Sequence, residues 1–122
     1  MEIIMFAGPN GSGKSTLIND FLYNPKHQGL LYVCPDAFFP LLYPNPPTDH
    51  EEYKKCYITT MELAEKIRTT LIDEGREFVF ETVFSTNEKI DFLKNARRKG
   101  FWVREYILPY LHYRGHGRTI RY

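Results

Sequence analysis

Residues 8–15 read Gly-Pro-Asn-Gly-Ser-Gly-Lys-Ser and match GxxxxGK[ST], the phosphate-binding P-loop or Walker A pattern, at every fixed position. The glycines let successive backbone N–H groups point at phosphate oxygens, and a following helix adds the positive end of its dipole. Lys14 would reach the β- and γ-phosphates of a nucleoside triphosphate, and the Ser15 hydroxyl would ligate Mg²⁺. The predicted contacts to ATP come from Gly8, Pro9, Asn10, Gly11, Ser12, Gly13, Lys14, Ser15 and Thr16.

Two acidic residues stand where chemistry on a phosphate would need them. Asp36 follows an apolar run at 30–34, and a carboxylate there could accept the proton of a substrate hydroxyl. Glu81 ends another apolar run and could hold a water on Mg²⁺. Each also has a plainer interpretation: Asp36 could cap a turn, and Glu81 could be a surface residue at a strand end.

Alternating strands and helices must position these residues. Apolar runs predict strands at 2–7, 30–34, 77–84 and 101–108, and a helix at 15–23. Thr48 or Asp49 would cap a long helix that ends at Gly75, and Ser85 would cap a third that ends at Gly100. This order predicts one α/β domain over residues 1–122, of the P-loop NTPase, nucleotide-kinase-like class. It would have three layers, with about four parallel strands and helices on both faces.

The later helices are amphipathic, and the segment between the second strand and the long helix is rich in proline. Residues 40–47 hold four prolines and are predicted to form a stiff surface loop. Apolar residues at helical spacing predict the buried faces. In the long helix these are Tyr53, Cys56, Thr60, Met61, Ala64, Ile67, Leu71 and Ile72, and in the third helix they are Ile90, Leu93 and Ala96.

Composition excludes several classes of protein. No apolar run approaches the ~20 residues of a membrane span, and the apolar start lacks the basic region of a signal peptide, so we expect a cytoplasmic location. Cys34 and Cys56 have no CxxC spacing and are expected to be reduced packing residues, and the four His form no metal-binding pattern. The charge is uneven, because residues 94–122 hold eight Lys and Arg and one acid, Glu105.

The chain resembles the zeta-toxin family of P-loop kinases, which includes UDP-N-acetylglucosamine kinases, over about residues 1–108. The resemblance rests on the P-loop and, in order after it, on VCPD at 33–36, EFVFETVFS at 77–85 and ARRKGF at 96–101. It implies that Lys14 binds the transferred phosphate, Asp36 is the general base on a sugar hydroxyl, and Glu81 lies near the metal on the strand beside the P-loop strand. It also implies that Arg114, Arg118 and Arg121 neutralise developing charge, as an arginine finger does.

The chain departs from the family pattern at three points. Cys34 stands where relatives usually have Asn, and only residues 109–113 replace a helix before the arginine segment. The chain ends where relatives continue into a further helix and a fifth strand, so we expect a shortened member with a truncated C-terminal part. A missing strand would leave an open sheet edge through which a homodimer could form.

The leading hypothesis is an ATP- and Mg²⁺-dependent kinase that phosphorylates a hydroxyl of a small metabolite, such as a nucleotide sugar. The alternative is a catalytically impaired ATP-binding remnant that acts through binding or partner interaction, and an antitoxin-like protein is one such partner. The basic, aromatic C-terminal stretch leaves nucleic-acid binding as a weaker third hypothesis. An ABC-type ATPase is disfavoured, because the chain lacks an LSGGQ-like signature and a hydrophobic-DE Walker B.

Overall fold

The computed structural model describes residues 1–8, 14–82, 85–107 and 118–122, without the side chains of Lys14 and Arg118. In chain order the elements are β1 (Glu2–Ala7), α1 (Lys14–Tyr23), the 3₁₀ turn η1 (Pro25–His27), β2 (Leu31–Val33), α2 (Pro35–Leu42), α3 (His50–Asp73), β3 (Phe78–Thr82), α4 (Thr86–Arg98), β4 (Trp102–Ile107) and β5 (Arg118–Arg121). The predicted α/β class is confirmed, with every predicted strand and helix present.

The strands form one sheet in the order β2-β3-β1-β4-β5. β1 pairs in parallel with β3 and β4, and β2 pairs in parallel with β3. β5 runs antiparallel to β4, with Arg118 opposite Ile107 and Arg121 opposite Arg104. The sheet therefore has five strands where about four are predicted from the sequence, and β5 lies at the edge beside β4.

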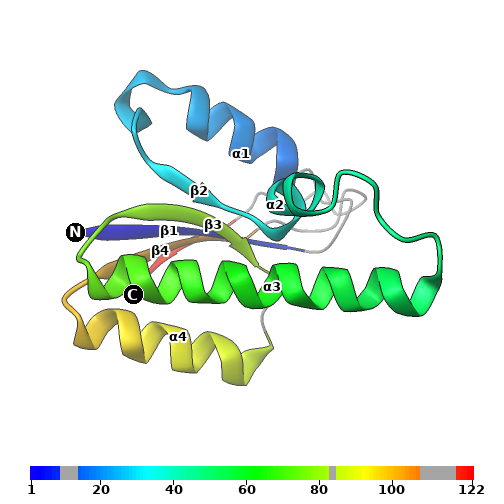
Figure 1. Ribbon diagram of the computed structural model, residues 1–122. Coiled ribbons are helices and arrows are strands. Elements are labelled where there is room, and N and C mark those ends of the chain that lie inside the picture. The colour runs from blue at the N-terminus through cyan, green and yellow to red at the C-terminus, as the bar shows by residue number, and fades with distance from the viewer. Residues whose placement is uncertain (9–13, 83–84, 108–117) are drawn as a thin grey trace.

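Helices cover both faces of the sheet, as predicted (Figure 1). Successive side chains of a strand point to opposite faces, and β1 feeds two separate cores. Ile3 and Met5 pack in the core that contains residues of α3 and α4, whereas Ile4 and Phe6 pack with Ile18 of α1. Strands buried on both faces explain why the apolar runs in the sequence are continuous rather than alternating.

Local capping rules account for the ends of the two long helices. Asp49 is the N-cap of α3 and accepts a hydrogen bond from the Glu52 N–H, and Ser85 caps α4 in the same way. Gly75 and Gly100 follow α3 and α4 with φ of 70° and 90°, a left-handed conformation that favours glycine. The caps predicted at Asp49 and Ser85 are confirmed, and Thr48 is not the N-cap.

Helix α2 was missed by the sequence analysis, which placed its last residues in a proline loop. The helix continues through Pro40, which has no N–H to donate to the carbonyl four residues earlier. Contacts distant in sequence stabilise it, because the Phe39 ring lies 5.0 and 6.2 Å from the rings of Tyr53 and Tyr57 in α3. Tertiary packing of aromatic rings therefore overrides a local signal against helix.

The predicted apolar faces are confirmed in part. In α3, Thr60, Ala64, Leu71 and Ile72 are buried, but Met61 is 45% exposed. In α4, Ala96 is buried and Leu93 packs beside it, whereas Ile90 is 43% exposed and Phe92 packs on the core instead. No helix within the described residues is long and apolar enough to cross a membrane.

Candidate functional site

The carboxyl ends of β1 and β3 lie side by side, with Phe6 opposite Glu81 and Ala7 opposite Thr82. Helix α1 begins at Lys14, and the exposed Ser15 lies in its first turn. Glu81 therefore lies on the strand beside the P-loop strand, where the resemblance places it. Residues 9–13 of the predicted P-loop lie outside the described part of the chain, so their contacts to ATP remain predictions.

Asp36, Glu81 and Cys34 form one cluster at this edge of the sheet. Cys34 follows β2, Asp36 lies in the first turn of α2, and Glu81 is in β3. One ligand atom from each of the three side chains lies within 4.8 Å of the other two. The Cys34 thiol donates a hydrogen bond to Glu81 Oε1 over 3.1 Å. The structure thus brings together the two acids that the sequence singled out and a cysteine that it assigned to packing.

Two tyrosines frame this cluster. The Tyr57 hydroxyl of α3 donates to Asp36 Oδ1 over 3.4 Å, a long hydrogen bond. Burial and then the Asp36 carboxylate raise the pKa of Tyr57. Burial also raises the pKa of Tyr32, and its hydrogen bond with Cys34 raises it further. Both hydroxyls therefore stay protonated at neutral pH and serve as donors.

Cys34 is a free cysteine and only 3% exposed, which is consistent with the predicted reduced packing residue. Burial raises its pKa, and Glu81 adds to that effect, while the hydrogen bond from Tyr32 opposes it. A neutral thiol beside a carboxylate is a hydrogen-bond donor and a poor nucleophile. In this state the hydrogen bond from Cys34 orients the Glu81 carboxylate.

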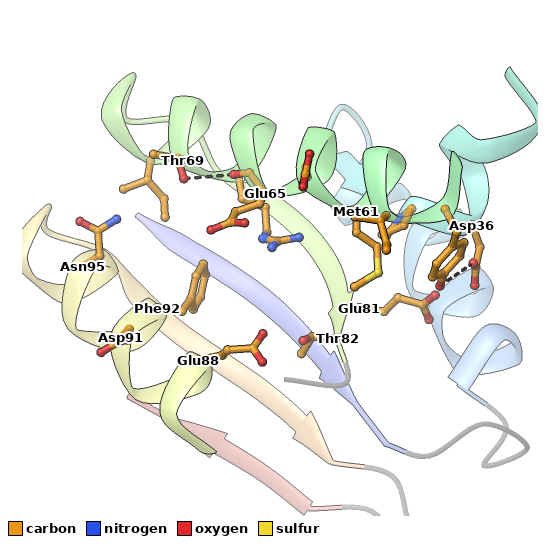
Figure 2. A pocket seen from close by; sticks show the side chains of 16 residues that line it. Asp36, Met61, Glu65, Thr69, Glu81, Thr82, Glu88, Asp91, Phe92 and Asn95 are labelled. Carbon is orange, nitrogen blue, oxygen red and sulfur yellow. Dashed lines mark hydrogen bonds between the residues drawn. The ribbon is translucent and has the colours of Figure 1, made fainter. Parts of the chain in front are cut away.

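A cleft of about 870 Å³ opens from the cluster and runs between α3 and α4. Figure 2 shows Asp36 and Glu81 at one end of the cleft, with Glu88 and Phe92 of α4 further along it. Its size fits a small organic ligand. Its walls carry six acids, namely Asp36, Glu62, Glu65, Glu81, Glu88 and Asp91.

One arginine, Arg68, lies among the described side chains that line the cleft. Its guanidinium lies 5.3 Å from the centre of the Phe80 ring, and burial lowers its pKa while Glu65 and Glu88 oppose that effect. Apolar contact comes from Tyr57, Ile58, Met61, Ile72 and Phe92. The cleft is therefore rich in hydrogen-bond acceptors beside apolar surface, which suits a ligand that donates hydrogen bonds.

Arg121 is the one predicted arginine whose side chain lies within the described part of the chain. Arg121 lies at the opposite end of β1, where its Nε is 3.9 Å from Glu2 Oε2 and its guanidinium is 4.7 Å from the Trp102 ring. This position separates Arg121 from the carboxyl edge that holds Glu81. The backbone of Arg118 pairs with Ile107 at that edge, and Arg114 lies outside the described residues.

The basic C-terminal stretch is partly neutralised within the fold. Arg104 lies 3.1 Å from Glu2, and Lys99 lies 3.6 Å from Asp73. The guanidinium of Arg97 lies 4.0 Å from the Trp102 ring. These contacts give local roles to charges and to an aromatic ring that motivated the nucleic-acid hypothesis.

Comparison with known protein families identifies the family of this chain. The sequence profile of the zeta toxin family matches residues 2–109, and the chain therefore belongs to that family. A comparison with curated protein sequences finds no match.

Three solved structures share the fold over 88% of this chain. They are a candidate kinase from Chloroflexus aurantiacus (TM-score 0.66, 15% identity), a chain of the PezAT toxin–antitoxin system of Streptococcus pneumoniae (0.68, 18%) and a chain of the Pnkp1/Rnl/Hen1 RNA repair complex (0.62, 17%). This chain spans 58%, 46% and 32% of their respective lengths. At these identities the likeness establishes a shared P-loop kinase fold.

Proposed function

We propose that the protein binds ATP with Mg²⁺ at residues 8–16 and transfers the γ-phosphoryl group to a hydroxyl of a small metabolite, such as a nucleotide sugar. The observation that carries this proposal is the approach of Asp36 and Glu81, within 4.8 Å, at the carboxyl edge beside the P-loop strand. Membership of the zeta toxin family and the kinase-like fold support the same chemistry.

Asp36 is the proposed general base. Its carboxylate lines the cleft and already accepts a hydrogen bond from the Tyr57 hydroxyl, so an acceptor hydroxyl in the cleft could donate to it as well. Proton removal makes the hydroxyl oxygen a better nucleophile as the bond to phosphorus forms. Tyr57 would hold the carboxylate in position and is a proposed positioning residue.

Lys14 and the P-loop amides are proposed to bind the triphosphate. The Ser15 hydroxyl in the first turn of α1 and the Glu81 carboxylate at the end of β3 are oxygen donors of the kind that Mg²⁺ prefers, so the residues present fit this ion. When bound, Mg²⁺ would offset the negative charge of the phosphates. The backbone of Arg118 begins β5 at the same edge, and Arg118 is proposed to add positive charge there.

The cleft supports a sugar as the part of the acceptor that enters it. Sugar hydroxyls donate hydrogen bonds to carboxylates, and six acids line the walls. A diphosphate among the same acids would be repelled, because like charges in a partly desolvated site cost free energy. We therefore propose that the sugar of a nucleotide sugar lies between α3 and α4 and that its phosphates lie outside the described cleft.

Phosphoryl transfer from radiolabelled ATP to a panel of sugars and nucleotide sugars tests the proposal. Asp36→Asn should lower the transfer rate by about 10²–10⁴-fold, the usual contribution of a general base, and keep the thermal stabilisation by ATP·Mg²⁺. Asp20→Asn, on the exposed face of α1, is the matched control and should change neither. Full activity in Asp36→Asn would overturn the assigned role.

The same assay separates the kinase from the alternative of an ATP-binding protein without turnover. Stabilisation by ATP·Mg²⁺ with no phosphorylated product from any acceptor would support the alternative and contradict the kinase. Loss of stabilisation in Lys14→Met would place the nucleotide at the P-loop in either case.

A further inference from the structure

The side chains of Cys34, Asp36 and Glu81 place one sulfur and two carboxylates around a common point. They come from three separate stretches of backbone, namely the end of β2, the first turn of α2 and the end of β3. Asp36 and Glu81 line the cleft, so the point is reached from solvent, while Cys34 is a buried residue. A soft donor on a buried residue beside two oxygen donors on more exposed residues offers ligands to a small cation.

The donor set of one sulfur and two carboxylates favours a thiophilic ion over Mg²⁺. Zn²⁺ binds thiolate sulfur at about 2.3 Å and carboxylate oxygen at about 2.0–2.2 Å, so tetrahedral ligands lie about 3.4–3.6 Å from one another. Here the Cys34 sulfur and Glu81 Oε1 are 3.1 Å apart, and all three ligand atoms lie within 4.8 Å. Small side-chain rotations would reach the required distances. Mg²⁺ takes oxygen ligands and would leave the sulfur unused.

The sulfur also has a hydrogen-bond partner outside the cluster. Tyr32 hydrogen-bonds to Cys34. Metal ligands commonly have such an outer partner that fixes their orientation. The thiol now directs its proton at Glu81, and that proton would leave to solvent as the sulfur–metal bond forms.

We infer that Cys34, Asp36 and Glu81 form a binding site for a thiophilic divalent cation such as Zn²⁺, with water in the remaining position. Binding of the cation is independent of the proposed function. Its consequence rests on that function: the ion engages both the proposed base Asp36 and the proposed Mg²⁺ ligand Glu81, so it inhibits phosphoryl transfer until a chelator removes it.

Titration of the reduced protein with Co²⁺, a spectroscopic substitute for Zn²⁺, tests the site in the absence of ATP. The wild type should develop a thiolate-to-cobalt absorption band that saturates at one ion per chain and is removed by Zn²⁺. Cys34→Ser should abolish the band and weaken Zn²⁺ binding by more than about 100-fold, beyond the 10–100-fold typical for loss of an outer partner. Tyr32→Phe should stay within that smaller range.

Cys56→Ser is the matched control, because Cys56 lies in α3 outside the cluster. It should keep the band, and it leaves Cys34 as the single thiol. In this variant Zn²⁺ should slow modification of Cys34 by a thiol reagent, which provides a second test if Cys34→Ser fails to fold. A band that survives in folded Cys34→Ser, or modification that Zn²⁺ does not slow, would overturn the site.

Inhibition is measured separately. If the proposed kinase activity is present, Zn²⁺ should inhibit the Cys56→Ser variant and spare Cys34→Ser. Zn²⁺ binding at Cys34 without inhibition would overturn the inferred consequence and leave the cation site standing. Cobalt binding can be scored even if no acceptor is phosphorylated, so failure of the proposed function and failure of the cation site are distinguishable.

Discussion

The ammonium of Lys89 on α4 lies 2.6 Å from Oε1 of Glu105, a carboxylate in β4 that is 1% exposed. The hydroxyl of the C-terminal residue Tyr122 donates to the same oxygen over 2.8 Å. Glu105 is the only acid of the basic C-terminal stretch, and these contacts connect its strand, β4, to α4 and to the residue after β5. Backbone hydrogen bonds between Tyr122 and Val103 complete this attachment.

Lys89→Met should destabilise the fold. It leaves the Glu105 carboxylate buried with Tyr122 as its remaining described partner, and loss of one partner of a buried pair costs about 3–5 kcal/mol. Because Lys89 is 30% exposed, water screens the pair and we expect a value near the lower end, about 3 kcal/mol.

A double-mutant cycle with Glu105→Leu checks this prediction. The double variant should be more stable than Lys89→Met alone, since it leaves no buried charge. Urea unfolding gives the free energies, and additive effects of the two substitutions would contradict the coupling.

Alkaline pH should weaken the same contacts of Glu105. Burial raises the pKa of Tyr122, and the hydrogen bond to Glu105 raises it further. Burial lowers the pKa of Lys89, but its hydrogen bonds to Glu105 and Tyr122 outweigh that effect, so the pKa of Lys89 is also raised. The folded protein therefore keeps protons that the unfolded chain loses near pH 10. This stability is fully present below pH about 10 and is lost as the pH rises through the raised values.

Urea midpoints measured between pH 8 and 11 test this dependence. Tyr122→Phe should flatten the decline, because the titrating hydroxyl is gone, whereas Tyr23→Phe, at a residue 85% exposed, should follow the wild type. Identical pH profiles for the wild type and Tyr122→Phe would exclude a contribution from this hydroxyl.

Tyr57→Phe should lower phosphoryl transfer by a factor of about 2–10. This range corresponds to the loss of a hydrogen bond worth about 0.5–1.5 kcal/mol, and the bond to Asp36 is long. Tyr53→Phe is the matched control, since its ring also contacts Phe39 but its hydroxyl has no hydrogen-bond partner among the described residues.

The kinetic constants show where Tyr57 acts. If Tyr57 positions the base, Tyr57→Phe should lower kcat and leave the KM for ATP unchanged. In a protein that already carries Asp36→Asn, adding Tyr57→Phe should lower the transfer rate no further. Equal rates for Tyr57→Phe and Tyr53→Phe would contradict a positioning role.

Most of the fold follows from local rules in the sequence. Asp49 and Ser85 cap helices because their side chains reach an N–H three residues on, and Gly75 and Gly100 end helices through a left-handed backbone. Each of these signals lies within a few residues of the helix end that it determines. α2 is different, because its proline argues against helix and the rings that stabilise it come from α3, ten or more residues away.

The candidate site likewise contains contacts that the sequence could predict and contacts that it could not. The approach of Asp36 and Glu81 could be predicted, since carboxyl ends of parallel strands share one edge. Cys34 could not be placed beside them as a partner, because 47 residues separate it from Glu81 and neither has a spacing pattern that signals the contact. Arg121 was grouped with Arg118 by proximity in sequence, but in a strand a few residues span enough length to carry it toward the other end of the sheet.

Occlusion of the cleft should separate acceptor binding from ATP binding. Met61 lies on the wall formed by α3 and is 45% exposed, so a larger side chain can be accommodated without disturbing the core. Met61→Trp should fill space between α3 and α4 and raise the KM for the acceptor about tenfold or more, with kcat and ATP·Mg²⁺ stabilisation close to wild type. Ile90→Trp is the control, because Ile90 is 43% exposed on α4 and does not line the cleft. Steady-state kinetics on both variants decide the matter: an unchanged acceptor KM in a folded Met61→Trp protein would mean that the acceptor binds elsewhere.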